Sequence, residues 1–411
     1  MSVPVRAGEP TAPSASLTLP LRRSGCPFAP PPEYAGLTEE HPLHQVRLYD
    51  GSTTWVITRL AEARALLTDP RLSAEPSRPG FPIVEPGQAG LRTEPNPPFV
   101  KMDPPRHTSY RRMLIGEFTL RRLNALRPRI QAVVDRLLDQ LEAGPRPADL
   151  VEALALPVPS IVTCELLGVP YADHGFFESR ARTAIRRGSS PAQRQRAFIE
   201  LLTYLDRLLV RKDRDPQDDL LSRLVVEQER TGNLTHDQLV SAAMLLLTAG
   251  HETSANMISL GTLMLLRHPE QLAALRADPA LLPGAVEELL RYLSIADTVP
   301  TRVAVEDIEV AGRTIRAGEG VVVLAAAVDH DPRAFERPAE FDITRSARHH
   351  IAFGYGIHQC LGQNLVRIEL EIVFASLFER FPDLRVAVPE EALPFRHDAE
   401  LYGVWQLPVT W

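Results

Sequence analysis

The chain has 411 residues, of which 44% are hydrophobic, 24% charged and 6% aromatic, an ordinary composition for a globular protein with a large core. Its net charge of −7 argues against a nucleic-acid binder, which normally presents a basic surface. The three cysteines, Cys26, Cys164 and Cys360, are far apart and form no disulfide framework, so we expect a cytoplasmic protein in a reducing environment.

The opening stretch, MSVPVRAGEPTAPSASLTLP, is rich in proline, alanine and serine and has no apolar core of signal-peptide length. We therefore expect residues 1–25 to form a disordered tail, followed by a single domain over residues 26–411. The longest candidate for a membrane span, AAMLLLTAG, is too short to cross a bilayer. No attachment to a membrane is predicted.

The next elements alternate between strand and helix patterns. VRLYDGSTTWVIT predicts a β-hairpin that turns at Asp50-Gly51, and RLAEARALLTDP predicts a helix. Residues 77–105 are irregular and rich in proline, which indicates either disorder or a functional binding loop. Residues 107 to about 288 follow a helical pattern, and DIEVAGRTIRAGEGVVVL returns to short strands. The predicted fold is mainly α, with a minor β portion formed from both ends of the chain.

Several charged residues stand out in the helical part of the chain and directly after it. In DPPRHTSYRR, His107 and Arg111 lie on one helix face, where they could clamp an acidic group or simply form a basic surface. In VEELLRYL, Glu288 and Arg291 have the i, i+3 spacing that is common in surface ion pairs. Arg302 stands among apolar and β-branched residues in TVPTRVAVED.

The segment from Leu234 to Pro269 predicts one long helix of roughly 50 Å, at about 1.5 Å per residue. Thr235 and Gln238 form a plausible capping box at its start. AGHET interrupts the middle of this apolar helix with a glycine, an acid and an alcohol, which are poor or competing residues there. The motif indicates either a helix opened locally for a ligand and a proton path, or a polar patch facing solvent.

FGYGIHQCLG places Cys360 at the start of a helix whose apolar residues recur at three- and four-residue steps. Backbone N–H groups and the positive end of the helix dipole favour a thiolate at that position. Gly354, Gly356 and Gly362 let the backbone approach a flat or bulky group. A buried structural cysteine is the alternative, but the glycines and the helix start favour a ligated or reactive sulfur.

In their order and wording, these motifs resemble those of the cytochrome P450 monooxygenases, particularly the soluble actinobacterial class. The resemblance runs from CPFAPPPEYA to the closing LPVTW. FGYGIHQCLG matches the haem-binding stretch F-G-x-G-x-H-x-C-x-G at every fixed position, which is a highly specific match. AGHET matches the oxygen-activation motif, ELLR matches the E-x-x-R pair, and DPPRHTSYRR matches D-P-P-x-H-T-x-x-R.

The resemblance implies the cytochrome P450 fold, with a long central helix over a buried haem b whose iron has Cys360 as its axial thiolate ligand. It makes Thr253 and Glu252 the catalytic pair that supplies hydrogen bonds and protons for activating dioxygen. Glu288 and Arg291 become a buried structural pair, joined by Arg345. The remaining residues that it assigns to haem binding are His107, Arg111, Ala249, Gly250, Arg302, Phe353, Gly354, His358 and Gly362.

The same resemblance gives a tentative substrate pocket. Family order places there part of the loop at residues 77–100, together with Ala243, Leu246, Ile295, Val299 and Tyr402. Most of these positions are apolar, which suits a lipophilic substrate.

Two segments depart from the family pattern or add to it. Residues 327–332 read AVDHDP where the family commonly has A-N-R-D-P, a change expected to alter local packing rather than chemistry. The predicted lid segment RARTAIRRGSSPAQRQR carries six arginines, which form either a solvated basic surface or a guide for an anionic or carrier-bound substrate. They are Arg180, Arg182, Arg186, Arg187, Arg194 and Arg196.

The function implied is oxidation of a hydrophobic small molecule, by hydroxylation or epoxidation, by a monomeric haem-thiolate monooxygenase. The class of substrate would be a secondary metabolite such as a macrolide, polyene, terpenoid or sterol-like compound. Dioxygen would be used with two electrons from a ferredoxin and its NAD(P)H-dependent reductase, because the chain shows no flavin domain and no G-x-G-x-x-G fingerprint.

Electrostatic docking of an acidic ferredoxin requires a basic patch near the cysteine loop. The candidates are Arg112, Arg348 and Arg367, for which ordinary surface charge is the alternative interpretation. Two other functions stay open. A peroxide-driven peroxygenase or decarboxylase usually lacks the acid–alcohol pair, and a non-catalytic haem protein that binds ligands or senses gas has no need of it.

Overall fold

The computed structural model describes residues 17–94, 97–185, 189–397 and 401–411. The α-helices are α1 (Glu33–Glu40), α2 (Leu60–Leu67), α3 (Arg106–Ile115), α4 (Leu120–Ala143), α5 (Pro157–Leu167), α6 (His174–Ile185), α7 (Pro191–Arg214), α8 (Leu220–Leu224), α9 (His236–Ala249), α10 (Glu252–Arg267), α11 (Pro269–Ala277), α12 (Leu282–Leu293), α13 (Ala325–Val328) and α14 (Gln363–Arg380). The strands are β1 (Leu43–Arg47), β2 (Thr53–Ile57), β3 (Leu72–Ser73), β4 (Ala148–Asp149), β5 (Thr301–Ala304), β6 (Ile308–Val310), β7 (Arg313–Ile315), β8 (Gly320–Val323), β9 (Arg385–Val386) and β10 (Pro408–Thr410).

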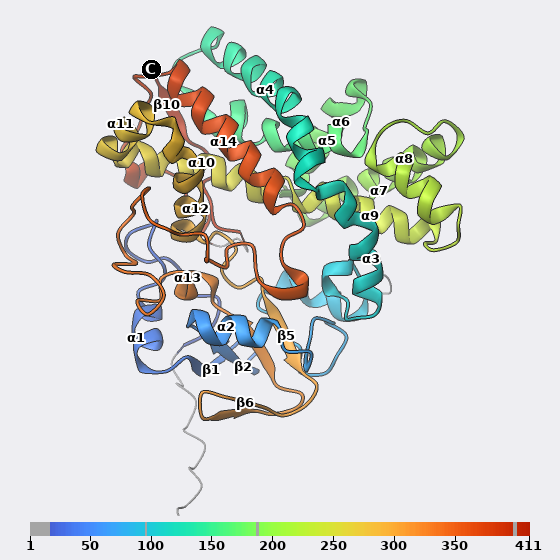
Figure 1. Ribbon diagram of the computed structural model, residues 1–411, viewed down its shortest axis with the longest axis vertical. Helices are drawn as coiled ribbons and strands as arrows, with labels where there is room; N and C mark the ends of the chain where they lie inside the picture. Colours follow the sequence, from blue (N-terminus) through green and yellow to red (C-terminus); the bar gives the residue numbers. More distant parts are fainter. Residues whose placement is uncertain (1–16, 95–96, 186–188, 398–400) are drawn as a thin grey trace, which may run out of the picture.

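The main sheet joins the two ends of the chain in the strand order β1-β2-β8-β5-β3. Strands β1 and β2 form the predicted hairpin, with Arg47 opposite Thr53, and β2 runs parallel to β8 from the second half of the sequence. This sheet lies at one end of the molecule, and most of the helices gather at the other end (Figure 1). The mainly α fold with a minor β portion from both ends of the chain is thereby confirmed.

The prediction of one uninterrupted helix from Leu234 to Pro269 is wrong. Helix α9 ends at Ala249, and α10 begins at Glu252. Glycine is a poor helix former, and the break falls at the Gly250-His251 step, inside AGHET, as the hypothesis of a locally opened helix requires. The capping box at the start is confirmed: Thr235 accepts from the backbone N–H of Gln238 at 3.3 Å, and its own N–H donates to Gln238 at 2.9 Å.

The two largest hydrophobic clusters of the described residues lie among the helices. The first combines the inward faces of α4, α10, α12 and α14, and α4 packs along α14 (Figure 1). The second combines α3, α7, α8 and α9. Helix α5 contributes to both, with Val158 and Val162 in the first cluster and Cys164 and Leu167 in the second. We call them the cofactor-side cluster and the lid-side cluster.

The N-terminal segment packs on the domain earlier than its composition suggests. Thr18 pairs with Arg47 beside β1, and the side chains of Leu19 and Arg23 are 2% and 6% exposed. Residues 17–25 thus belong to the folded chain, because Leu19 fills a core position that proline- and serine-rich surroundings conceal in the sequence. Residues 1–16 of the expected tail lie outside the described residues.

The proline-rich loop is ordered through packing where it is described. Phe81, Ile83 and Val84 are buried, and short 3-10 turns span Pro86–Thr93 and Phe99–Lys101. Of its two predicted alternatives, these contacts favour the binding loop over disorder. Among the described residues, no helix has the length and apolar character that crossing a bilayer requires.

Candidate active site

A cavity of about 370 Å³ lies between the cysteine loop, the break between α9 and α10, and the segment at residues 295–302. Its walls are largely apolar, with a small number of polar and charged groups, which is the composition of a small-molecule site. The predicted site residues that line it are Arg111, Leu246, Ala249, Gly250, Thr253, Ile295, Val299, Arg302, Phe353, Gly354, His358, Cys360 and Gly362.

Cys360 lies in a tight loop directly before α14. Its backbone N–H donates to the carbonyl of Phe353 at 2.8 Å, which closes the loop. Gly356 has φ +75°, and a Cβ there would come 2.6 Å from the carbonyl oxygen of Leu67, so this turn requires glycine. Burial raises the pKa of the Cys360 thiol, while the backbone N–H groups of Gly362 and Gln363 lower it by a smaller amount.

One part of the cavity wall includes His358, whose ring packs against that of a second histidine, His107. His107 is 1% exposed, and neither of its ring nitrogens has a hydrogen-bond partner among the described residues. Its ring centroid lies 4.1 Å from that of His358, whose buried Nδ1 likewise has no partner in the described part of the chain. Burial and the nearby Arg302 lower the pKa of His358 to about 2. Unpaired buried groups of this kind indicate a missing ligand.

Two arginines complete this side of the cavity. Arg302 is 8% exposed, and it donates to the carbonyl of its neighbour Thr301 at 2.7 Å. Burial lowers the pKa of Arg302 to about 10 and also lowers the pKa of Arg111. Neither arginine forms an ion pair within the described ranges of the chain. The two arginines supply positive charge and the two neutral histidines supply ring N–H groups, an arrangement suited to a ligand with carboxylates.

Another part of the cavity wall is formed by Thr253 of the acid–alcohol pair, and Glu252 stands next to the cavity. The Thr253 hydroxyl donates to the carbonyl of Ala249 at 2.9 Å, across the break between α9 and α10. The Glu252 carboxylate is ion-paired with Arg396 from the C-terminal segment. Arg396 is 7% exposed and also donates to Asn256 at 3.2 Å. Arg396 therefore fixes the position of an acid that stands next to the cavity.

Glu288 and Arg291 form a pair that is completely buried behind the cavity. Arg291 donates from Nε and Nη2 to the two carboxylate oxygens at 2.7 and 2.8 Å, and both side chains are 0% exposed. Arg345 adds a third contact at 3.1 Å, and Arg291 also donates to the carbonyl of Asp329 at 2.8 Å. The surface ion pair that the spacing alone allowed is thus replaced by a network in the core.

The unusual stretch at residues 327–332 supports this network. Asp329 is fully buried and accepts from Ser294 at 3.0 Å and from the backbone N–H of Ile351 at 2.8 Å. Asp331 accepts from the backbone N–H of Leu60 at 3.1 Å. Asp329 thus connects Ser294, at the end of α12, with Ile351, just before the cysteine loop. Asp331 connects the stretch at residues 327–332 with the start of α2.

Two of the tentative pocket residues lie elsewhere. Ala243 is fully buried in the lid-side cluster, one helical turn before Leu246, where neighbouring helices cover it. Tyr402 lines a second cavity of about 340 Å³ on the other side of the segment at residues 295–300. Lys101, which the sequence pattern did not single out, lines the main cavity and donates to Thr301 at 3.3 Å.

The three arginines considered for ferredoxin docking, Arg112, Arg348 and Arg367, differ in whether they are ion-paired or exposed. Arg367 forms an ion pair with Glu287 at 2.5 Å and lies 4.7 Å from the ring centroid of Phe353, so it is a structural residue and not a free docking cation. Arg112 and Arg348 are exposed.

In the arginine-rich lid segment, Arg180 and Arg196 pair with Glu200 at 2.8 and 3.5 Å. Arg194 is exposed and donates to the backbone carbonyl of Ser189 at 3.1 Å. Arg186, Arg187 and the side chain of Arg182 lie outside the described residues. The described arginines do not line the main cavity, which agrees with the solvated basic surface.

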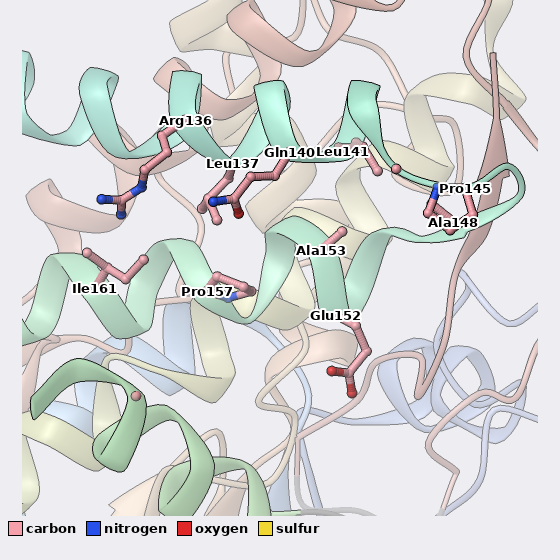
Figure 2. A pocket seen from close by; sticks show the side chains of 12 residues that line it. Arg136, Leu137, Gln140, Leu141, Pro145, Ala148, Glu152, Ala153, Pro157 and Ile161 are labelled. Carbon is pink, nitrogen blue, oxygen red and sulfur yellow. The ribbon is translucent and has the colours of Figure 1, made fainter.

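A further hollow of about 460 Å³ lies between α4 and the chain that leads into α5 (Figure 2). Arg136, Gln140 and Glu152 give it a mixed polar wall. The predicted site residues do not line it, so the larger hollow is not the reaction site.

Comparison with known proteins identifies the fold and the site together. Residues 176–397 match the family model described as Cytochrome P450. The chain belongs to the cytochrome P450 family. This P450 is 54% identical to pentalenic acid synthase of Streptomyces avermitilis over 98% of this chain and 99% of that protein. It is 50% identical to vitamin D3 dihydroxylase of Streptomyces griseolus, over 95% and 96%. The crystal structure of cytochrome P450 MoxA from Nonomuraea recticatena superposes with a TM-score of 0.93 at 53% identity, over 97% and 99%.

The family implies a haem, and the residues of this P450 fit one. The Cys360 thiol lines the cavity, as do Arg111 and Arg302, which have no ion pair within the described ranges. Both ring nitrogens of His107 and Nδ1 of His358 have no hydrogen-bond partner there, and this combination of cations and N–H groups suits two propionates. Gly354 and Gly362 line the cavity, and a Cβ at either position would have no neighbour within 4 Å, which leaves room for a flat ring close to the backbone.

Sequence reasoning missed two buried charged residues beside the acid–alcohol pair. The first is Arg396, whose partner Glu252 lies 144 residues earlier, a contact that no local pattern encodes. The second is Glu369, which is 2% exposed and lies beside Ser254 in the core between α14 and α10. A signal for Glu369 did exist: it stands four residues from both Leu365 and Val373, on the apolar face of its helix.

Glu369 predicts a pH dependence of stability. Burial raises its pKa from 4.5 to about 8, so the folded protein holds it protonated while the unfolded chain releases the proton above pH 4.5. The stability that the protonated Glu369 side chain contributes is fully present below pH 4.5 and is lost as the pH rises to about 8. We expect the free energy of unfolding of Glu369→Gln to equal that of the wild type near pH 5 and to exceed it by about 2–4 kcal/mol at pH 8.5.

Chemical denaturation of the holoprotein, followed by circular dichroism from pH 5 to 8.5, measures this difference. Glu379→Gln is the matched control, because Glu379 is exposed on the same helix. Parallel pH profiles for the wild type and Glu369→Gln would contradict the prediction.

Proposed function

We propose that this P450 monooxygenase binds haem b through Cys360 and hydroxylates or epoxidises a hydrophobic secondary metabolite. The observation that carries the proposal is the placing of Thr253, beside a helix break, and Cys360 on the walls of one apolar cavity. Bound haem supplies the reductive activation of dioxygen and the transfer of one oxygen atom to the substrate. Two of the relatives are named pentalenic acid synthase and vitamin D3 dihydroxylase, and these names support a lipophilic substrate.

The protein's own residues supply the setting for that chemistry. Arg111 and Arg302 would neutralise the propionates, and the ring N–H groups of His107 and His358 would donate to them. The break after Ala249 leaves space on the side of the cavity opposite the sulfur, and the Thr253 hydroxyl, anchored on the Ala249 carbonyl, holds a proton there. Glu252, the acid next to Thr253 in the sequence, is proposed to resupply that proton, and Arg396 holds its carboxylate in place.

The acid–alcohol pair separates this proposal from the other two functions. A peroxide-driven enzyme receives its oxygen already reduced and needs no proton delivery of this kind, and a ligand-binding haem protein performs no turnover. Consumption of NADPH and dioxygen with formation of product, when ferredoxin and reductase are supplied, would support the monooxygenase; turnover that needs only peroxide would contradict it.

Thr253→Ala is expected to keep substrate binding and electron uptake but to waste the electrons as peroxide. A positioned proton donor contributes roughly 10²- to 10⁴-fold to a reaction step, so product formed per NADPH consumed should fall by about tenfold or more. The measurement is product, peroxide and NADPH in the same reaction.

Thr248→Ala is the matched control for this experiment. The Thr248 hydroxyl makes the same bond to the carbonyl four residues earlier, Met244, at 2.9 Å, but Thr248 does not line the main cavity. If both variants lose coupling equally, or neither does, Thr253 has no special part in proton delivery.

The proposed electron donor is a ferredoxin that docks near the cysteine loop. Because Arg367 is bound to Glu287, the docking charges are now assigned to Arg112 and Arg348. We expect the double change to glutamate to raise the ferredoxin concentration for half-maximal rate by about fivefold or more at low salt, since charge-steered association is lost. The effect should shrink as salt rises and the Debye length falls below about 10 Å at 0.1 M.

Arg47→Glu is the control for net charge, because Arg47 is exposed on β1, the edge strand of the main sheet. Rates that respond neither to salt nor to the Arg112 and Arg348 changes would place the docking face elsewhere. The cytoplasmic location and the monomeric state stay predictions.

A further inference from the structure

The second cavity, of about 340 Å³, contains an unusual concentration of buried polar groups without partners. Arg23, Arg396 and Tyr402 line it and are 6%, 7% and 7% exposed. Arg23 Nη1, Arg396 Nε and the Tyr402 hydroxyl are all buried and have no hydrogen-bond partner among the residues that the structure describes. Each such group costs free energy unless something pairs with it, so three at one cavity indicate a ligand.

The charge of this cavity favours an anion. Arg23 lies over the Tyr402 ring, 4.3 Å from its centroid, and its Nη2 donates to the carbonyls of Leu293 and Ser294, at 2.7 and 3.1 Å. Within the described chain it has no ion pair, and burial lowers its pKa. Its guanidinium group is therefore a buried cation with an N–H group still unused.

The acidic residues near the cavity do not neutralise Arg23 by direct contact. Asp297 accepts from the Tyr34 hydroxyl at 2.6 Å and from the backbone N–H of Ala326 at 2.8 Å, so each of its oxygens is already bonded. Burial also raises the pKa of Asp297. Glu85 lines the cavity as well, where the exposed Arg22 adds a further positive charge.

The second cavity adjoins the main cavity. Ile295 lines both of them, and the backbone N–H of Tyr402 donates to the Ile295 carbonyl at 2.9 Å. One segment, residues 295–300, thus separates an apolar chamber beside Cys360 from a chamber with buried arginine and phenol groups. A ligand that occupies both needs an apolar body and one anionic end.

We propose that the second cavity binds a carboxylate of the substrate through Arg23 and Tyr402, so that the substrate class is a lipophilic carboxylic acid. This inference deepens the proposed function and rests on it for the position of the reacting carbon. The guanidinium of Arg23 supplies a charge-assisted hydrogen bond, and the Tyr402 hydroxyl supplies a second donor. Arg396 borders the same cavity and links it to Glu252 on the other side.

The test compares two probes that differ in charge but share one chain length, dodecanoate and 1-dodecanol. Their affinities for the holoprotein are measured by calorimetry and, in parallel, by the shift of the haem absorption band. In the wild type we expect dodecanoate to bind about tenfold or more tightly than the alcohol, because hydrogen bonds to charged groups are among the stronger polar contacts. Both probes should shift the haem band.

Arg23→Gln should bring the ratio of the two affinities close to one without changing the affinity for the alcohol. Arg23→Lys should keep part of the preference, and Tyr402→Phe should weaken dodecanoate binding by about threefold, the effect of one lost donor. Arg121→Gln, which removes an exposed charge on α4, is the matched control and should keep the full ratio.

Equal binding of acid and alcohol to the wild type would overturn the proposal, as would an unchanged ratio in Arg23→Gln with an intact melting temperature. Dodecanoate binding that leaves the haem band unshifted would overturn the claim that one ligand spans both cavities. The spectrum of the reduced protein with carbon monoxide keeps the two proposals distinguishable: loss of the thiolate band would contradict the haem assignment, while a flat affinity ratio with that band intact contradicts the carboxylate site alone.

Discussion

Replacing Cys360 with serine is expected to abolish monooxygenase turnover and the red-shifted carbon monoxide band of a thiolate-ligated haem. Serine keeps the size of the side chain and the loop hydrogen bond from the Cys360 backbone N–H to Phe353, but it removes the sulfur proposed to donate electron density to the haem iron. The loss of activity should therefore be complete, while far-ultraviolet circular dichroism stays that of the folded protein. The measurements are the reduced carbon monoxide spectrum and product formation with redox partners.

The two other cysteines provide the controls. Cys26 is exposed and Cys164 is buried in the lid-side cluster, so neither sulfur lines the main cavity. Cys26→Ser and Cys164→Ala should keep the carbon monoxide band. A variant of either one that loses the band while Cys360→Ser retains it would falsify the ligand assignment.

The second large effect is expected from Glu288→Ala. This change leaves the guanidinium of Arg291, which is 0% exposed, and that of Arg345 without their shared carboxylate in the core. Removing one partner of a buried ion pair costs about 3–5 kcal/mol, because the remaining charge is uncompensated. A domain of ordinary stability has only about 5–15 kcal/mol, so we expect a much lower yield of folded, haem-containing protein and a large drop in melting temperature.

Glu75→Ala is the matched control, since Glu75 and Arg78 have the same Glu-x-x-Arg order and a 3.1 Å contact but side chains that are 28% and 43% exposed. Breaking this exposed pair should cost less than about 1 kcal/mol. Similar losses of stability in the two variants would show that burial does not set the importance of the Glu288–Arg291 pair. Glu288→Gln, which keeps the shape and part of the hydrogen bonding, should give an intermediate result.

The parts of the site that short motifs encode could be predicted from the sequence. The cysteine loop depends on glycines at fixed steps from Cys360, and the break near Gly250 follows from a residue that helices disfavour. Such features are local in the chain, so a pattern of about ten residues contains all the information they need. The hairpin at Asp50-Gly51 belongs to the same group.

Features that depend on distant partners could not be predicted. Arg367 looks like a surface charge in the sequence, and only the folded chain brings Glu287 to it. Arg396 and Arg23 are separated from their contacts by 144 and 270 residues. Charged residues are normally exposed, so a sequence pattern assigns them to the surface, and that prior fails at functional sites, where buried charges are retained for their chemistry.

The packing of most helices into a cofactor-side and a lid-side cluster bears on which residues of this enzyme can be substituted during evolution. The cofactor-side cluster includes the inward faces of α10, α12 and α14, while the lid-side cluster is built mainly from α3, α7, α8 and α9. Interiors that pack separately open as separate cooperative units, so amide hydrogens of α7 and α8 should exchange with solvent sooner than those of α14. Substitutions in the lid-side cluster could therefore admit new substrates while they lower the stability of the cofactor-side cluster very little.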